Sequence, residues 1–261
     1  METLEKFIQP IEELKKKLHN NIIPFEVEKH FDGLIIYMPC KKYRYCDVVL
    51  DNQSYGNENF NFEYCFATFN DISSSDNIVP NLSADEVVDK FKARYIDFNK
   101  WLIEEFPFLL PKNRFTGQVV EDYDYSHTEL DALPRGWYIN FGVDICREIK
   151  NALLECQMKN PTGGYDNWDD DSGKKIPYLE GYTISQIKEK YGRLHWYDFG
   201  APQSVLDIIS KYEKISSEIC IECGKPAKYE TRGWITFICE DCAKKFKEES
   251  LIKLGEENER D

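Results

Sequence analysis

Apolar residues recur at helical spacing in residues 2–20, the first patterned stretch of the chain. They fall on one side of a 3.6-residue repeat, opposite a polar side, and predict an amphipathic helix. The apolar positions are Leu4, Phe7, Ile8, Ile11, Leu14 and Leu18. Because Pro10 lacks the N–H that a helix interior requires, the main helix is expected to begin or bend there.

Strand-like runs follow this helix at 33–38, 46–50 and 60–69. They are short and rich in aromatic and β-branched residues, and apolar residues alternate with polar ones in the third. These runs predict a small antiparallel sheet. Residues 70–83 are polar and are expected to form a loop.

Two long helices are predicted in the middle of the chain. Ser83 and Glu86 have the spacing of a capping box, which opens a helix expected to run to about residue 105. Apolar periodicity returns over 137–159 and predicts a second helix, which the Pro and Gly residues of 160–164 end.

The next part of the chain is predicted to hold a short helix at 184–191, a strand at 194–199 and a helix at 203–217. Gly192 would end the first of these helices. Polar residues alternate with the apolar ones along this strand, so they would lie on its outer face and form a candidate binding surface. They are Arg193, His195 and Tyr197.

Two C-x-x-C pairs near the end of the chain are the clearest chemical pattern. Cys220 and Cys223 form the first pair, Cys239 and Cys242 form the second, and fifteen residues separate the pairs. This is the ligand set and spacing of a four-thiolate zinc site. Four thiolates leave no open coordination position, so we interpret the site as structural. The alternative, a redox pair or disulfides, would need a thioredoxin-like context or an oxidising compartment.

The residues around these cysteines predict a zinc ribbon. A hairpin is expected over 227–238, with its turn at Arg232-Gly233, and an amphipathic helix is expected after Cys242. So small a unit would take much of its folding free energy from the metal, on the order of 10 kcal/mol. The ribbon is expected to pack on the 194–199 strand and on the helix before Cys220. Its candidate binding residues are Lys228, Arg232 and Trp234.

The chain carries 33 Lys and Arg against 47 Asp and Glu, a net charge of −14. Such acidity argues against nonspecific binding of nucleic acid and suits a basic protein partner. Between residues 220 and 247 the balance reverses, with six Lys and Arg against four acids. Nucleic-acid binding through the ribbon is therefore an alternative hypothesis.

The sequence also bears on the compartment. No apolar run approaches the ~20 residues of a membrane span, and residues 1–7 lack the basic and apolar regions of a signal peptide. Five of the nine cysteines lie outside the two pairs, in apolar or strand-like stretches, and are expected to be reduced. We therefore expect a cytoplasmic protein with no membrane segment.

Three motifs follow one another in the C-terminal half: Gly136-Trp137 opening a helix, the segment 187–197, and the paired cysteines with Gly233-Trp234 between them. They resemble a family of uncharacterised bacterial and phage proteins. Its members share a G-W helix start, a segment like V-K-E-K-F-G-x-L-R-F-Y, and terminal zinc knuckles whose last ligand is often His; here it is Cys242. The resemblance covers about residues 136–246 and implies a bacterial or phage source.

Together these patterns predict an α+β fold, with an N-terminal helix, a small antiparallel sheet and further helices, ending in the four-cysteine zinc ribbon. The expected regions are an N-terminal α+β domain at 1–135, a helical and strand segment at 136–218 that packs on the ribbon, and the ribbon with a C-terminal helix at 219–261.

For function, the favoured hypothesis is a non-enzymatic factor that binds another protein, of phage or mobile-element origin, such as an inhibitor of a host defence protein. The ribbon would form its contact or oligomerisation surface. The sequence holds no nucleophile elbow, P-loop or dinucleotide fingerprint. A metal-dependent nuclease or hydrolase with dispersed carboxylates is the third hypothesis, and its candidates are Asp47, Asp51 and Glu63.

Overall fold

The computed structural model describes residues 12–21, 23–30, 33–38, 42, 46–51, 63–71, 74–113, 116–167 and 172–255. It divides into two compact units. The first comprises residues 1–100 with 124–126, and the second comprises 101–123 with 127–261. The division falls within a long helix, earlier than the boundary at residue 135 that the sequence suggests.

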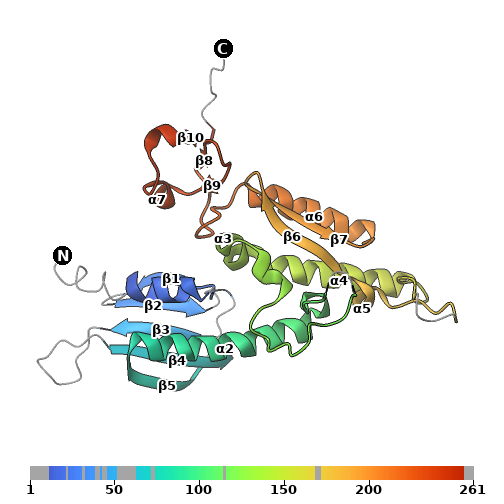
Figure 1. Cartoon of the computed structure of the whole chain (residues 1–261), viewed down its shortest axis with the longest axis horizontal. Helices are drawn as coiled ribbons and strands as arrows, with labels where there is room; N and C mark the ends of the chain where they lie inside the picture. Colours follow the sequence, from blue (N-terminus) through green and yellow to red (C-terminus); the bar gives the residue numbers. More distant parts are fainter. Residues whose placement is uncertain are drawn as a thin grey trace, which may run out of the picture. The chain divides into compact units, whose positions relative to one another are not determined.

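The first unit contains a five-stranded antiparallel sheet in which each strand pairs with the next along the chain (Figure 1). Its strands are β1 (Glu26–His30), β2 (Gly33–Met38), β3 (Cys46–Asp51), β4 (Glu63–Asp71) and β5 (Ser74–Leu82). The predicted strands at 33–38 and 46–50 are confirmed. The third predicted strand is confirmed from Glu63 onward, and its first three residues lie outside the described residues.

The loop predicted at 70–83 is wrong, because most of that segment is β5, which pairs with β4. The polar composition of Ser74–Leu82 conceals a strand at the edge of the sheet. Pro80 is compatible with this position, since an edge strand has backbone N–H groups that need no partner within the sheet. The sequence also missed β1.

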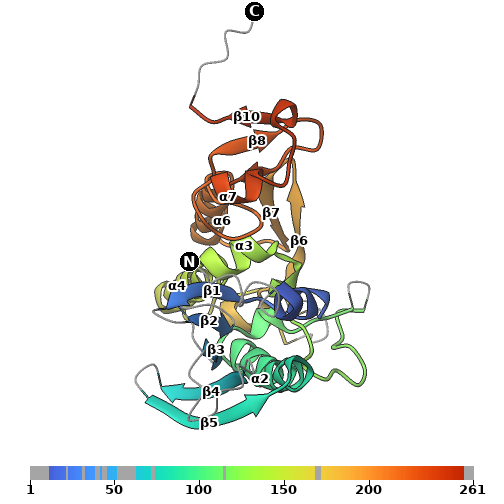
Figure 2. The ribbon, with the colours of Figure 1, turned by 90° about the vertical axis from the view of Figure 1, so that its left-hand side faces the viewer.

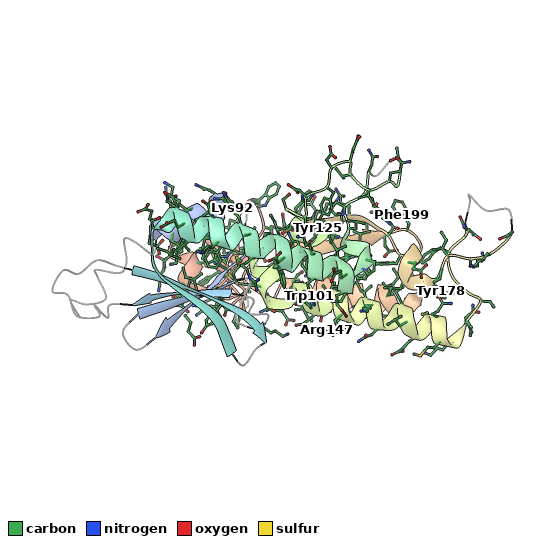
Figure 3. All side chains as sticks on the ribbon, turned by 90° about the horizontal axis from the view of Figure 1, so that it is seen from below. Lys92, Trp101, Tyr125, Arg147, Tyr178 and Phe199 are labelled. Carbon is green, nitrogen blue, oxygen red and sulfur yellow. The ribbon has the colours of Figure 1, made fainter. Side chains whose placement is uncertain are left out.

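Two helices pack in the first unit, and the second of them continues beyond residue 100 into the second unit. One spans residues 12–20 and buries Leu14 and Leu18. The other, α2 (Ala84–Glu105), runs alongside the sheet with Lys92 on its outer side (Figure 3). The predicted capping box is confirmed: the Ser83 backbone N–H donates to Glu86 Oε2 at 2.8 Å, and the Glu86 N–H donates to Ser83 Oγ at 3.3 Å. Both helices exist because their apolar faces meet the core, and residues 2–11 of the first predicted helix lie outside the described residues.

The second unit begins with short helical turns, η2 (Pro107–Leu109) and η3 (Glu129–Ala132), followed by α3 (Arg135–Trp137). A π-helical turn, η4 (Tyr138–Gly142), joins α3 to α4 (Val143–Lys159). The helix predicted at 137–159 is thus confirmed, with an irregular first part. Trp137, Phe141 and Ile149 are among its buried residues, so this helix provides the core on which the rest of the unit packs.

A two-stranded antiparallel hairpin follows the short helix α5 (Tyr178–Gly181) and consists of β6 (Ile184–Lys190) and β7 (Arg193–Asp198). The predicted strand at 194–199 is confirmed, but the helix predicted at 184–191 is wrong. Gly192 does not end a helix; it forms the hairpin turn with Tyr191, and both residues have positive φ, +53° at Tyr191 and +74° at Gly192.

Helix α6 (Gln203–Ser216) confirms the helix predicted at 203–217 and lies alongside β7 (Figures 1 and 2). The backbone N–H of Leu194 donates to Ser216 Oγ at 2.9 Å, which ties the start of β7 to the end of the helix. Buried Val205, Ile209 and Tyr212 form the inner face of α6.

The last part of the unit is a three-stranded antiparallel sheet in the order β10-β8-β9. Its strands are β8 (Tyr229–Thr231), β9 (Phe237–Ile238) and β10 (Leu251–Lys253), with α7 (Glu240–Ala243) and η5 (Glu248–Ser250) between β9 and β10. The hairpin predicted over 227–238 is confirmed. The helix predicted after Cys242 is wrong, since α7 ends at Ala243 and Leu251 pairs with Thr231 in the sheet.

The structure is therefore an α+β fold with small antiparallel sheets, as the sequence predicts. Among its described helices, none has the length and apolar character that crossing a membrane requires.

Candidate metal centre

The first pair of cysteines lies on a tight backbone turn. The Gly224 N–H donates to the Cys220 carbonyl at 2.9 Å, and the Cys220 N–H donates to the Lys225 carbonyl at 2.7 Å. Gly224 has φ +75°, a conformation that glycine adopts without the steric cost of a Cβ atom. The turn therefore brings Cys220 and Cys223 onto one side of the chain.

The second pair sits at the start of α7. Cys239 is the N-cap of this helix, and its Sγ accepts from the Cys242 N–H at 3.5 Å. The Ala243 N–H donates to the Cys239 carbonyl at 2.9 Å and closes the turn. The start of α7 therefore brings Cys239 and Cys242 together, as the glycine turn does for Cys220 and Cys223.

Backbone hydrogen bonds join the two turns. The Ile221 N–H donates to the Phe237 carbonyl at 3.0 Å, and the Lys228 N–H donates to the Ile238 carbonyl at 2.8 Å. The predicted hairpin between the pairs is what makes this possible, because β8 returns the chain along β9. Cys223 and Cys239, sixteen positions apart in the sequence, therefore meet in space.

The four cysteine sulfurs form one cluster. All lie within 4.8 Å of one another, with Cys223 Sγ 3.5 Å from Cys239 Sγ and 3.7 Å from Cys242 Sγ. A tetrahedral ion with metal–sulfur distances of ~2.3 Å has sulfur–sulfur edges of about 3.8 Å. None of the four forms a disulfide. The sulfur positions fit a metal ion at their centre.

The environment of the cluster is apolar. Cys220 and Ile238 are fully buried, and Ile221, Tyr229 and Leu251 pack around the cluster. Without a cation, the crowded thiols cannot all ionise. A hydrogen bond from the Cys223 thiol lowers the pKa of Cys220 to about 4, the same contact raises the pKa of Cys223, and burial raises the pKa of Cys242 to about 12. A divalent cation would hold all four as thiolates.

The first cysteine turn is anchored to α3 and η4, at the start of the helical segment that leads into α4. The Gly136 N–H donates to the Ile221 carbonyl at 2.8 Å, and Asn140 Nδ2 donates to the Gly224 carbonyl at 2.8 Å. A Cβ on Gly136 would lie 2.0 Å from the Cys220 carbonyl oxygen, so only glycine permits this approach. The G-W motif is thus a docking point for the first cysteine turn.

A second contact joins the centre to the β6–β7 turn. A Cβ on Gly192 would lie 2.8 Å from the Phe237 ring. Packing on the 194–199 strand and on the helix before Cys220 was expected from the sequence. The anchoring contacts at Gly136, Asn140 and Gly192 were missed, because nothing in the local pattern links them to the cysteines.

The candidate binding residues of the ribbon lie on its surface. Lys228 and Arg232 are exposed, and the Trp234 side chain is 77% exposed. Buried Thr231 holds the turn that carries Trp234: its hydroxyl donates to the Trp234 carbonyl at 2.6 Å and accepts from the Thr236 N–H at 2.9 Å. The tryptophan therefore projects from a fixed turn.

A groove of about 470 Å³ lies beside this turn. Its lining is mainly apolar, with two carboxylates and one guanidinium. Its apolar residues include Pro134, Ile221, Trp234 and Phe246, and its charged residues are Glu189, Glu222 and Arg232.

The basic character of the ribbon is partly neutralised. Asp241 pairs with both Lys225 and Lys244, each at 2.9 Å, and these two ammonium groups lower the pKa of the carboxyl to about 2. The basic residues of segment 220–247 therefore do not form a continuous cationic surface.

The other candidate binding residues, Arg193, His195 and Tyr197, alternate along β7. Arg193 and Tyr197 are exposed, and His195 is half-buried. His195 Nδ1 lies 3.9 Å from Glu213 on α6. These residues share a hairpin with β6, which the sequence had assigned to a helix.

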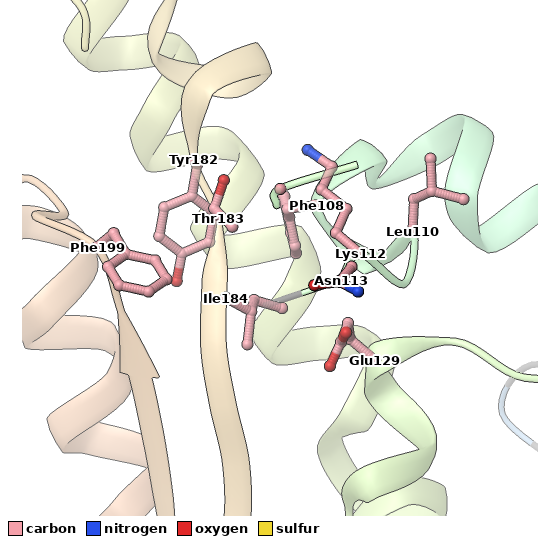
Figure 4. Close-up of a pocket in the computed structure, with 10 residues that line it drawn as sticks. Phe108, Leu110, Lys112, Asn113, Glu129, Tyr182, Thr183, Ile184 and Phe199 are labelled. Carbon is pink, nitrogen blue, oxygen red and sulfur yellow. The ribbon is translucent and has the colours of Figure 1, made fainter. Parts of the chain in front are cut away.

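A smaller cavity of about 70 Å³ opens between the 108–113 segment and the start of β6 (Figure 4). Tyr182 and Phe108 pack edge to face at its wall with ring centroids 5.2 Å apart. Ligand pockets commonly span ~300–1,000 Å³, so this space is too small for such a ligand.

The dispersed-carboxylate candidates lie on neighbouring strands. Asp51 is directly opposite Glu63 in the β3–β4 register, and Asp47 is opposite Ala67. Over the residues that the structure describes, the four cysteines are the one group of three or more His, Cys, Asp or Glu placed to share a metal.

The fold and this site define an α+β protein with a cluster of four cysteines placed to hold a metal ion. Comparisons with protein-family models, curated protein sequences and solved structures give no match.

Proposed function

We propose that the four cysteines bind zinc in a closed structural site and that the resulting zinc ribbon presents Trp234 to a protein partner. An all-sulfur tetrahedral set is typical of structural zinc and, less often, of iron. Since four thiolates fill the coordination shell, the metal has no position for a substrate. The metal would therefore have a structural and not a catalytic role, and we propose a binding factor.

The observation that carries this proposal is the exposure of Trp234. A large aromatic side chain that is 77% exposed on a hydrogen-bonded turn has no role in the core. Tryptophan and arginine are the residues most enriched among the energetic centres of protein interfaces, and Arg232 lies two positions away. The adjoining groove offers apolar walls for a partner side chain.

The charges of the groove favour protein over nucleic acid as the partner of the ribbon. Glu189 and Glu222 line it beside Arg232, and carboxylates repel phosphates. Asp241 further neutralises two of the nearby lysines. The net charge of −14 would steer a basic protein toward this chain.

For the biological setting, we propose a cytoplasmic protein of phage or mobile-element origin that sequesters a host factor, such as a defence enzyme. The support is the resemblance of residues 136–246 to bacterial and phage proteins and the acidity of the chain.

Affinity purification of the tagged full chain from its native host tests the proposal. We expect one stoichiometric protein that is lost with Trp234→Ala and with Arg232→Ala. Phe199→Ala is the matched control, because Phe199 is also highly exposed, at 61%, but lies outside the ribbon. A partner retained by Trp234→Ala would contradict the proposed surface.

Two further measurements address the metal and the competing hypotheses. Elemental analysis should find about one zinc per chain; four free thiols with no metal would contradict the zinc ribbon. Nucleic-acid retention that is lost on charge reversal of Lys228 and Arg232 would favour a nucleic-acid regulator instead. Metal-dependent turnover that disappears with Glu63→Gln would favour a hydrolase.

A further inference from the structure

The β6–β7 hairpin has two unlike faces. Cross-strand partners in an antiparallel pair lie on the same face, and Ile187 pairs with Trp196 on the buried one. On the other face the partners are Lys190 with Arg193, Lys188 with His195, and Gln186 with Tyr197. We name this the cationic face, which comprises Gln186, Lys188, Lys190, Arg193, His195 and Tyr197.

Like charges stand opposite each other on the cationic face. Lys190 is directly opposite Arg193, an arrangement that destabilises a sheet. Within the described part of the chain, no carboxylate forms an ion pair with Lys188, Lys190 or Arg193. A chain with 47 acidic residues has ample means to pair these cations, so their concentration here is not explained by stability.

Carboxylates near the hairpin are directed elsewhere or lie at its margin. Glu189 belongs to the opposite face and accepts the Gly192 N–H at 2.6 Å. Glu213, on α6, is 3.9 Å from His195 Nδ1. Lys188 Nζ donates to the neutral Gln186 Oε1 at 2.7 Å, so the three fully charged side chains of the cationic face keep their net charge for an anionic partner.

The turn of the hairpin provides a second, independent observation. Tyr191 has φ +53° and is 68% exposed. Two-residue hairpin turns with positive φ strongly favour Asn, Asp or Gly, because a larger side chain is strained there. A strained, exposed aromatic residue points to a function for the ring.

Aromatic rings and cations alternate on this hairpin. Lys188 Nζ lies 5.1 Å from the Tyr197 ring centroid, and Lys190 Nζ lies 5.3 Å from that of Tyr191. Proteins that bind single-stranded nucleic acid combine such cations, which contact phosphates, with aromatic rings on which bases stack.

We propose that the cationic face and Tyr191 bind single-stranded nucleic acid. Lys188, Lys190 and Arg193 contact the phosphates, and Tyr191 stacks on an unpaired base. The acidity of the rest of the chain repels nucleic acid and so confines binding to this face. The inference is independent of the ribbon and its protein partner. Single-stranded DNA and single-stranded RNA share the recognised chemistry.

Fluorescence anisotropy with the zinc-loaded full chain and labelled single-stranded DNA or RNA oligonucleotides tests the proposal. Binding should weaken as salt rises. The double variant Lys190→Glu/Arg193→Glu should weaken binding at least tenfold and reduce the slope of log K against log salt by about 1.4, since each phosphate contact in a single strand contributes about 0.7. Lys92→Glu/Lys159→Glu, at side chains 48% and 80% exposed on α2 and α4, is the charge-matched control and should change little.

Tyr191→Asn separates stacking from charge. This variant suits the turn and should fold, yet it should weaken binding about fivefold or more with an unchanged salt slope, because stacking releases no counterions. Tyr191→Phe should bind like the natural chain. Whichever oligonucleotide binds more tightly, DNA or RNA, identifies the natural ligand.

Three results would overturn the proposal. One is the absence of salt-dependent binding to either strand at low salt. Another is full binding by Tyr191→Asn. The third is a poly-glutamate peptide that binds as tightly as the oligonucleotides and is insensitive to Tyr191→Asn, which would assign the face to an acidic protein.

Discussion

Two antiparallel hairpins in the second unit of this protein differ in their turn residues and in how their like charges are neutralised. In the ribbon, β8 and β9 are joined by a turn with Gly233 at φ +82°, and Asp241 neutralises neighbouring lysines. In the β6–β7 hairpin, Tyr191 occupies a left-handed turn position, and Lys190 faces Arg193.

The difference separates residues kept for stability from residues kept for binding. Each unusual feature of the ribbon removes a cost: glycine relieves the backbone, the carboxylate offsets like charges, and the proposed zinc replaces a missing core. The β6–β7 hairpin retains two unfavourable features, a tyrosine at positive φ and a Lys190–Arg193 pair that no described carboxylate neutralises. Costs retained in a folded protein are most simply understood as functional.

Removal of the metal would test the ribbon side of this comparison and should have the largest effect. Chelation, or Cys239→Ser, should unfold residues 220–253, because the metal supplies on the order of 10 kcal/mol to such a unit. Limited proteolysis should then cut at Arg232 and Lys244 and spare the β6–β7 hairpin. Cys156→Ser, a half-buried cysteine outside the cluster, is the control and should keep its metal. A ribbon that resists proteolysis without metal would contradict the proposed structural role of the metal.

Gly136→Ala tests the anchor of the ribbon. Its Cβ would lie 2.0 Å from the Cys220 carbonyl oxygen and 2.7 Å from the Ile221 carbonyl carbon, and backbone cannot rotate away as a side chain can. We expect a loss of about 3 kcal/mol in the free energy of unfolding, measured with denaturant. Gly142→Ala should cost little, because its nearest neighbour would be a Leu133 side-chain carbon at 3.5 Å. Equal losses at the two positions would argue against a specific close approach.

Tyr191→Asn tests the strained turn and should stabilise the protein. Asparagine tolerates positive φ better than tyrosine does, so we expect a gain of about 1 kcal/mol, seen as a higher Tm. Gly192→Ala should do the reverse, since φ is +74° and a Cβ would meet the Phe237 ring at 2.8 Å. A lower Tm for Tyr191→Asn would mean that the tyrosine ring stabilises the fold.

Arg193→Glu should have the smallest effect, again in the stabilising direction. It would convert the Lys190–Arg193 pair into opposite charges, worth about 0.3 kcal/mol on an exposed strand. Thermal unfolding at low salt would reveal the gain, and high salt should abolish it. Arg193→Gln should give a smaller gain. Destabilisation by Arg193→Glu would indicate that the cation is compensated within the fold.

Local patterns predicted well those elements whose cause is local. The capping box at Ser83 opened a helix because its two hydrogen bonds join residues three apart. The hairpin over 227–238 was predicted because its turn residues and flanking strands are contiguous. Helix α6 followed from its own apolar face.

The β6 strand was mistaken for a helix for an identifiable reason. A register irregularity between Ile184 and Gln186 leaves both Ile184 and Ile187 buried. The apolar spacing becomes three, which is the helical interval, and conceals the strand period of two. Only pairing with β7 makes the segment extended.

The helix predicted after Cys242 was wrong for a similar reason, because strand pairing overrides the local pattern. Phe246, Leu251 and Leu254 have an apolar spacing that suits a helix, yet Leu251 pairs with Thr231, twenty residues earlier along the chain. Pairing with β8 overrides a weak local preference, and no local pattern reports it.

The sequence by itself determined the four-cysteine cluster, because cysteines at that spacing carry both the ligand chemistry and the short turns that bring the sulfurs together. The alternation along β7 already predicted that Arg193, His195 and Tyr197 share a face, but only the tertiary structure adds the cations of β6 to it. Lys188 and Lys190 belong to β6, whose extended form depends on its partner, and strand pairing alone sets them opposite His195 and Arg193. Ligand chemistry is encoded in the spacing of a few residues, whereas a surface charge pattern exists only once distant segments have paired.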